Sequence, residues 1–132
     1  MTLHRTTALC YAVILTLVAS LNYLPIPGLV DDQGRTFGIF ALDIFDDALH
    51  LVSALWALAA ALISTRASRM FLILFGALYL GDGILGAFTG SGFLDLCIFT
   101  WGVLDIPFSL KLMSSVPHIL LGGVALVVGL RR

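Results

Sequence analysis

The sequence predicts an all-α membrane protein, a single membrane domain over residues 1–132 with four helices that run alternately up and down. Hydrophobic residues make up 60% of the chain and charged residues 11%, whereas soluble domains average about 25% charged residues. Four apolar runs are each long enough to cross a hydrocarbon core of about 30 Å as a helix. Every charged residue except Asp82 lies outside these runs.

Prolines mark one end of the first and of the fourth run. The first run covers residues 8–24 and is followed by Pro25, which removes a backbone donor and ends the helix. A signal peptide is an alternative reading of this run, because a short basic start precedes it. The fourth run covers residues 114–130, and we expect Pro117 in its first turn, where proline is tolerated.

The second and third runs, residues 48–64 and 70–88, are joined by the basic turn 65–69. Carboxylates favour a helix N-terminus, since they accept from free N–H groups and oppose the helix dipole. Asp46 and Asp47 are therefore expected to cap the second helix. The third run contains four glycines, whose predicted role is close helix packing; they are Gly76, Gly81, Gly83 and Gly86.

Two long connectors, residues 31–45 and 89–111, separate the helices of each hairpin. The apolar second half of the first connector is too short to span, so we expect it at the interface or folded back on the bundle. In the second connector, residues 93–106 are expected to form a short re-entrant or interfacial helix, with Trp101 at the level of the lipid headgroups.

Lysine and arginine are unequally divided between the two ends of the predicted bundle. Arg35 and Lys111 fall in the two long connectors, whereas the other five basic residues fall at the termini and in the basic turn. Basic residues concentrate on the cytoplasmic side of a membrane. The sequence thus predicts a protein of the cell inner membrane with both termini cytoplasmic and two long outer loops.

The chain aligns with itself, without a gap, at an offset of 68 residues. This offset superposes span on span and loop on loop, and it predicts two repeats, over about residues 5–64 and about 70–132. Because each repeat holds two spans, the repeats are parallel. The most informative matched pairs are Tyr11 with Tyr79, Gly34 with Gly102, Phe40 with Phe108, and His50 with His118.

These segments resemble an uncharacterised bacterial family of four-helix integral membrane proteins that carries only a domain-of-unknown-function label. The resemblance rests on Gly-Ile-Phe-Ala-Leu-Asp (38–43), Asp-Asp-Ala-Leu-His (46–50), Ser-Val-Pro-His-Ile-Leu-Leu-Gly-Gly (115–123) and the basic turn. The family usually has Asn near the start of the second helix. The resemblance implies a four-helix topology and no activity.

His50 and His118 are the leading candidate site residues, because polar side chains inside membranes usually have partners in the bundle. In the favoured interpretation, each histidine donates to a carbonyl of the connector above it and holds that connector down. The alternative is a shared ligand: a b-type haem, a chlorophyll-type pigment or a metal ion between two imidazoles at equal depth. Haem and metal cofactors are not favoured.

Asp82 is the second candidate, an acidic residue within the third run. It is expected within a turn or two of the histidine level, where it could complete a metal site with His50 and His118 or take part in proton or small-solute transport. The alternatives without a functional role are a structural hydrogen bond from Asp82 to a histidine and a protonated Asp82 side chain.

No catalytic pattern stands out, so the sequence does not predict an enzyme. It lacks a Gly-x-Ser-x-Gly nucleophile, a phosphate loop and a Cys-x-x-Cys pair. The net charge of −1 offers no basic patch for nucleic acid. Cys10 and Cys97 are too few for a disulfide framework. The expected role is a scaffold or accessory subunit that contacts the lipid bilayer and either other membrane subunits or its own copies.

Overall fold

The computed structural model describes residues 1–131, and this part of the chain is all-helical. It contains no β-strand beyond two isolated bridges in the first connector. Four helices are long and apolar enough to cross a membrane, which confirms the predicted fold class at that level. The elements are α1 (Leu3–Ser20), η1 (Leu21–Tyr23), α2 (Ile44–Ile63), α3 (Thr65–Thr89), α4 (Cys97–Trp101) and α5 (Phe108–Leu130).

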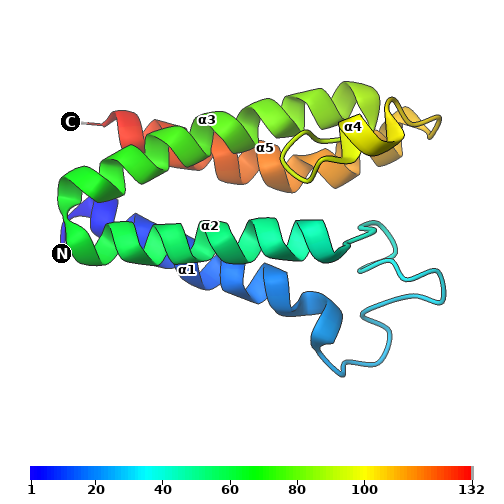
Figure 1. Cartoon of the computed structure of the whole chain (residues 1–132), viewed down its shortest axis with the longest axis horizontal. Helices are drawn as coiled ribbons and strands as arrows, with labels where there is room; N and C mark the ends of the chain where they lie inside the picture. The colour runs from blue at the N-terminus through cyan, green and yellow to red at the C-terminus, as the bar shows by residue number, and fades with distance from the viewer. Residues whose placement is uncertain (132) are drawn as a thin grey trace.

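The long helices form two hairpins that lie side by side (Figure 1). α1 packs along α2, and α3 packs along α5; contacts within each hairpin are far more extensive than contacts between them. Both ends of the chain lie at one end of the bundle, and the two long connectors lie at the other (Figure 1). The connector end therefore gathers loop segments from both hairpins.

Glycines bring α3 and α5 into backbone contact. A Cβ on Gly76 would lie 2.5 Å from the backbone nitrogen of Leu126, and a Cβ on Gly122 would strike the backbone of Leu80. Such close approach is how small residues join membrane helices. The packing role predicted for the glycines of the third run holds for Gly76, as it does for Gly83 and Gly86, which also contact α5. It was wrong for Gly81, where a Cβ would meet only the ring of Phe93 in the connector, at 3.8 Å.

Aromatic rings fill the seam between the two hairpins. Phe71 and Phe75 of α3 are buried, and the ring centroid of Tyr11 on α1 lies 5.3 Å from that of Phe75, edge to face. Edge-to-face pairs of this kind add to the energy of burial. Small residues complete the core, since Ala57 of α2 and Ala125 of α5 are fully buried.

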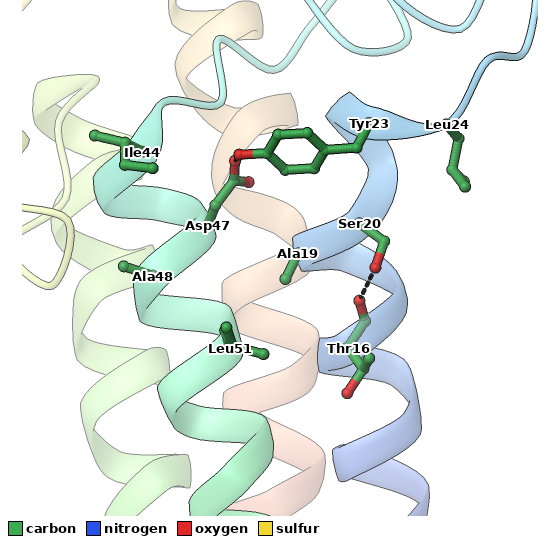
Figure 2. A pocket seen from close by; sticks show the side chains of 9 residues that line it. All are labelled: Thr16, Ala19, Ser20, Tyr23, Leu24, Ile44, Asp47, Ala48 and Leu51. Atoms are coloured by element: carbon green, nitrogen blue, oxygen red, sulfur yellow. Dashed lines mark hydrogen bonds between the residues drawn. The ribbon is translucent and has the colours of Figure 1, made fainter.

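The start of α2 uses its acidic residues differently from the prediction. Asp43 is the N-cap, and its side chain accepts from the N–H groups of Phe45 and Asp46, while the Asp46 carboxylate accepts from the N–H of Asp43. The capping role predicted for Asp46 is therefore confirmed. Asp47 instead accepts from the hydroxyl of Tyr23, at 2.9 Å. This bond closes the top of a cavity of about 400 Å³ between α1 and α2 (Figure 2).

The fourth span begins earlier than predicted, at Phe108 rather than near residue 114. Pro117 consequently lies inside α5, where it cannot donate to the carbonyl of Met113. The predicted position in the first turn was wrong, because Pro107 is the residue that precedes the helix. His118 therefore lies in the middle of a helix and not at its start.

The connection between the hairpins is a single residue, Ser64. Its hydroxyl accepts from the N–H of Ala67, at 3.0 Å, and so caps α3. The segment predicted as a basic turn is thus the first turn and a half of α3. The sequence feature that could have revealed this helix start is Ser64, an N-cap residue type, three residues before Ala67.

Polar side chains stabilise the fold of the first connector. The Asp31 carboxylate accepts from the N–H groups of Gln33 and Arg35, and the side chain of Arg35 lies 3.0 Å away. These contacts hold the pKa of Asp31 below its usual value. The backbone N–H of Arg35 contributes most, followed by the N–H of Gln33 and the guanidinium of Arg35. Buried Thr36 donates to the side chain of Asn22, which ties the connector to η1.

Candidate functional site

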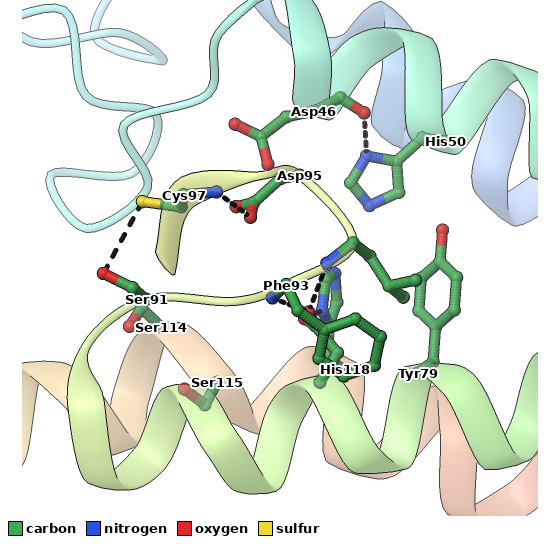
Figure 3. A network of polar contacts seen from close by, with 12 residues as sticks. Asp46, His50, Tyr79, Ser91, Phe93, Asp95, Cys97, Ser114, Ser115 and His118 are labelled. Carbon is green, nitrogen blue, oxygen red and sulfur yellow. Dashed lines mark hydrogen bonds and ion pairs between the residues drawn. The ribbon is translucent and has the colours of Figure 1, made fainter. Parts of the chain in front are cut away.

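His50 and His118 lie close together at the connector end of the bundle. His50 lies on α2 and His118 on α5. Their ring centroids are 5.8 Å apart, and the ring planes are inclined at 59°. Figure 3 shows the two rings on either side of the seam between the hairpins. The residues that the sequence paired by its repeat are therefore paired in space.

The tautomer of His50 follows from its partner. Its Nδ1 lies 2.7 Å from the backbone carbonyl oxygen of Asp46, one turn earlier in the same helix. A carbonyl can only accept, so Nδ1 carries the hydrogen. In the neutral ring, the Nε2 atom then keeps its lone pair. The side chain is buried, with the whole residue 5% exposed.

His118 is oriented by Asp82. Its Nδ1 lies 2.6 Å from Oδ2 of the carboxylate, whose side chain is 4% exposed. The carboxylate accepts, so Nδ1 of His118 is also the protonated nitrogen. A charge-assisted bond of this length is strong where water is excluded. One of the roles expected for Asp82 was a structural hydrogen bond with a histidine, and this bond is confirmed.

The second connector is held by Asp82 and not by the histidines. Oδ1 of Asp82 accepts from the N–H of Phe93, at 2.6 Å, and from that of Leu94, at 2.9 Å. The carboxylate approaches so closely that a Cβ on Gly92 would lie 2.6 Å from Oδ1. Glycine is thus required beside the carboxylate.

The prediction that each histidine holds a connector was therefore wrong. A ring in the second turn of α2 reaches the carbonyl four residues back, and Asp46 offers that carbonyl at 2.7 Å from His50. A carboxylate has two oxygens and can serve two partners at once. Asp82 does so, receiving His118 on one oxygen and the connector on the other.

Tyr79 is the site residue that sequence reasoning assigned no role. Its ring centroid lies 4.8 Å from that of His118 and 6.3 Å from that of His50. Its hydroxyl pairs with Ser53 at 3.1 Å. The available signal was its spacing, since residues three apart in a helix share a face and Tyr79 precedes Asp82 by three.

The geometry does not favour a haem or a pigment between the histidines. Tyr79 lies against both imidazoles, and Phe75 stacks on Tyr79 with centroids 3.9 Å apart. A macrocycle between His50 and His118 would have to displace these rings. Within residues 1–131, no group of three or more His, Cys, Asp or Glu side chains is arranged to hold a metal ion. Asp82 therefore supports His118 rather than forming a third ligand.

Cys97 belongs to the same polar region but not to the histidine pair. It opens α4, and its sulfur lies 3.7 Å from the hydroxyl of Ser91 (Figure 3). Burial raises the pKa of the thiol above its usual value, which disfavours the reactive thiolate. Cys97 and the exposed Cys10 are both free thiols. Nothing in this arrangement provides an activated nucleophile.

Comparison of the chain with protein-family models, curated proteins and solved structures finds no match. The resemblance to the uncharacterised four-helix family therefore stays a prediction.

Proposed function

We propose that the protein is a non-catalytic scaffold or accessory subunit of the inner membrane, held in a complex by packing of its helices against those of a partner. Its two termini are cytoplasmic, and its two connectors face outward. The observation that carries this proposal is an open, largely apolar groove on the outer face of α5, to whose lining Gly123 contributes.

The groove on α5 has the form of a helix-packing surface. Its volume is about 460 Å³, and a Cβ on Gly123 would meet no atom within 4 Å. Inside the chain, the neighbouring Gly122 allows the backbone of α3 to approach closely. Gly123 offers the same lack of bulk to a transmembrane helix from outside. The other lining residues are apolar except Arg131 at one end: Ile119, Leu120, Val124, Val127, Val128 and Arg131.

Filling this groove should release the partner. Gly123→Phe adds a ring where the chain itself has no atom nearby, so the bundle should fold while the partner helix is excluded. The complex should be recovered from mild detergent with wild-type protein and lost, by about tenfold or more, with the variant. Partner recovery and native molecular mass are the measurements.

Val13→Phe provides the matched control, because Val13 is 61% exposed on α1, away from the groove. It should leave the complex intact. A wild-type protein that runs as a lone monomer, with no partner recovered, would refute the proposal. So would equal loss of the complex in both variants.

The proposed orientation rests on the basic residues and on where the chain ends lie. The termini and the link at Ser64 share one end of the bundle (Figure 1). Arg5 and Arg69 at that end donate to main-chain carbonyls of the adjacent helix, those of Ala61 and Gly129. Positive charge at this end suits the cytoplasmic side.

The orientation predicts which sites an impermeant thiol reagent reaches in intact cells. A cysteine placed at exposed Asp32, in a background with Cys10→Ser and Cys97→Ser, should be labelled from outside. A cysteine at exposed Arg66 in the same background should be labelled only after the membrane is opened. The reverse pattern would invert the proposed topology. Labelled protein is read by mass shift on a gel.

Paired contacts support two parallel repeats. The hydroxyl of Tyr11 donates to the carbonyl of Leu121 at 2.6 Å, and the hydroxyl of Tyr79 pairs with Ser53 at 3.1 Å. Both members of each contact are related by the offset of 68 found in the sequence. Each first helix thus reaches across to the second helix of the other hairpin, as a two-fold axis along the membrane normal requires.

Transport through the bundle is less well supported than a scaffold role. The polar cluster of Asp82, His118 and His50 occupies the connector end only. Toward the other end, the interior is filled by Phe71 and Leu72, which are fully buried. Charged groups cross such an interior at high cost. Flux that depends on Asp82 in reconstituted vesicles would nevertheless reverse this preference.

A further inference from the structure

We propose that His50 and His118 bind one late first-row transition-metal ion, such as Zn²⁺ or Cu²⁺, through their two Nε2 atoms. This site goes beyond the scaffold role and does not depend on it. The ion would join α2 of one hairpin to α5 of the other, at the connector end of the seam.

Both imidazoles are already in the form that a metal requires. Nδ1 of His50 donates to the carbonyl of Asp46, and Nδ1 of His118 donates to the carboxylate of Asp82. A metal-binding histidine almost always gives its other ring N–H to a carbonyl or carboxylate, which fixes the tautomer and raises the basicity of the ligand. Each of these two histidines has such a partner, from a different residue.

The separation of the rings fits one shared ion. A metal–nitrogen bond of about 2 Å places the centroid of each imidazole about 3.2 Å from the metal. Two rings on one ion are then at most about 6.4 Å apart, centroid to centroid. The observed 5.8 Å falls inside this limit at a bent ligand angle. Tyr79 lies against both imidazoles and excludes a macrocycle from the same place, whereas a single ion needs far less room.

The surroundings favour a cation. Among residues 1–131, Nε2 of His50 and Nε2 of His118 make no hydrogen bond and are not fully buried, so in the neutral rings both lone pairs remain available to an ion. Its charge is partly balanced by Asp82, which lies 2.6 Å from His118, and by Asp46 and Asp95 near His50 (Figure 3).

The donor set selects the class of ion. Imidazole suits Zn²⁺, Cu²⁺ and Ni²⁺, whereas Ca²⁺ and Mg²⁺ prefer oxygen ligands. Affinity for nitrogen sites rises along the series to Cu²⁺ and is lower for Zn²⁺. Two protein ligands leave further positions on the ion open to water. The expected order is therefore Cu²⁺ before Ni²⁺ and Zn²⁺, with no binding of Mg²⁺.

The test is a titration of the purified full chain in detergent with Zn²⁺ and Cu²⁺, using an affinity tag without histidine. A background with Cys10→Ser and Cys97→Ser removes thiol ligands. One equivalent should bind, and His50→Ala and His118→Ala should each weaken binding by about tenfold or more. His4→Ala is the matched control and should bind as the parent does. Asp82→Asn should weaken binding by about tenfold through loss of the partner of His118.

A variant that fails to fold cannot be mistaken for one that lacks a ligand, because the ligands can also be counted without altering the site. X-ray absorption of the His4→Ala protein loaded with one equivalent of Zn²⁺ should show two imidazole nitrogens at about 2 Å. A metal shell without imidazole would overturn the proposal. Absence of binding by the parent protein, or equal weakening by His4→Ala and His118→Ala, would overturn it as well.

Discussion

Replacing Asp82 by alanine is expected to destabilise the protein by about 3 to 5 kcal/mol, because three donors lose the carboxylate that accepts their hydrogen bonds, at about 1 to 3 kcal/mol each. The substitution removes the acceptor of His118 Nδ1 and leaves the N–H groups of Phe93 and Leu94 without their carboxylate. The midpoint of thermal unfolding in detergent should fall. Hydrogen exchange at the amides of Phe93 and Leu94 should accelerate more than exchange elsewhere in the bundle.

Asp105→Ala is the control for this experiment, since Asp105 is an exposed carboxylate of the same connector. A change there should alter stability by less than about 0.5 kcal/mol. Asp82→Asn should fall between the two, because its amide oxygen can still accept from the connector. Protected Phe93 and Leu94 amides in Asp82→Ala would show that the connector is held by something other than this carboxylate.

Gly122→Ala is expected to destabilise the α3–α5 hairpin by about 3 kcal/mol, the upper range for overpacking a core. The added methyl group would strike the backbone of Leu80 and lie 2.9 Å from the carbonyl oxygen of Gly76. Backbone atoms cannot turn aside as a flexible side chain can, so the two helices must separate. Denaturation by a strong detergent, followed by helical circular dichroism, measures the loss.

The adjacent glycine makes an unusually close control. A methyl group at Gly123 meets no atom within 4 Å, and alanine is a better helix former than glycine by about 1 kcal/mol. Gly123→Ala should therefore be neutral or slightly stabilising. If the two alanine variants unfold alike, the backbone contact between α3 and α5 is not what limits stability.

The sequence predicted the helices well and their ends less well. Apolar length alone identifies four candidate spans, since the cost of exposing backbone polar groups to lipid leaves little alternative to a helix. The start of α5 was missed because residues 108–113 include Lys111, which is polar but still helix-favouring. Pro117 then looked like a helix start, although the structure has it well inside.

The residues of the candidate site were predicted from the sequence, but their hydrogen-bond partners were not. His50, His118 and Asp82 were singled out because each is polar within an apolar segment, and the three do meet. Which partner each takes depends on side-chain reach across three helices and a loop, which sequence spacing does not encode. Tyr79 was missed because a tyrosine in a membrane helix has no distinctive pattern of its own.

The one-residue link at Ser64 is a pivot about which the two hairpins can rotate relative to each other. The hairpins are joined covalently only at that end, and the histidine pair lies 14 residues from the pivot along α2, or about 21 Å. A small rotation at the pivot is therefore magnified where His50 faces His118. Asp82, its connector and His118 all belong to the α3–α5 hairpin, so only a contact across the seam, such as an ion shared by His50 and His118, would hold the two free ends together.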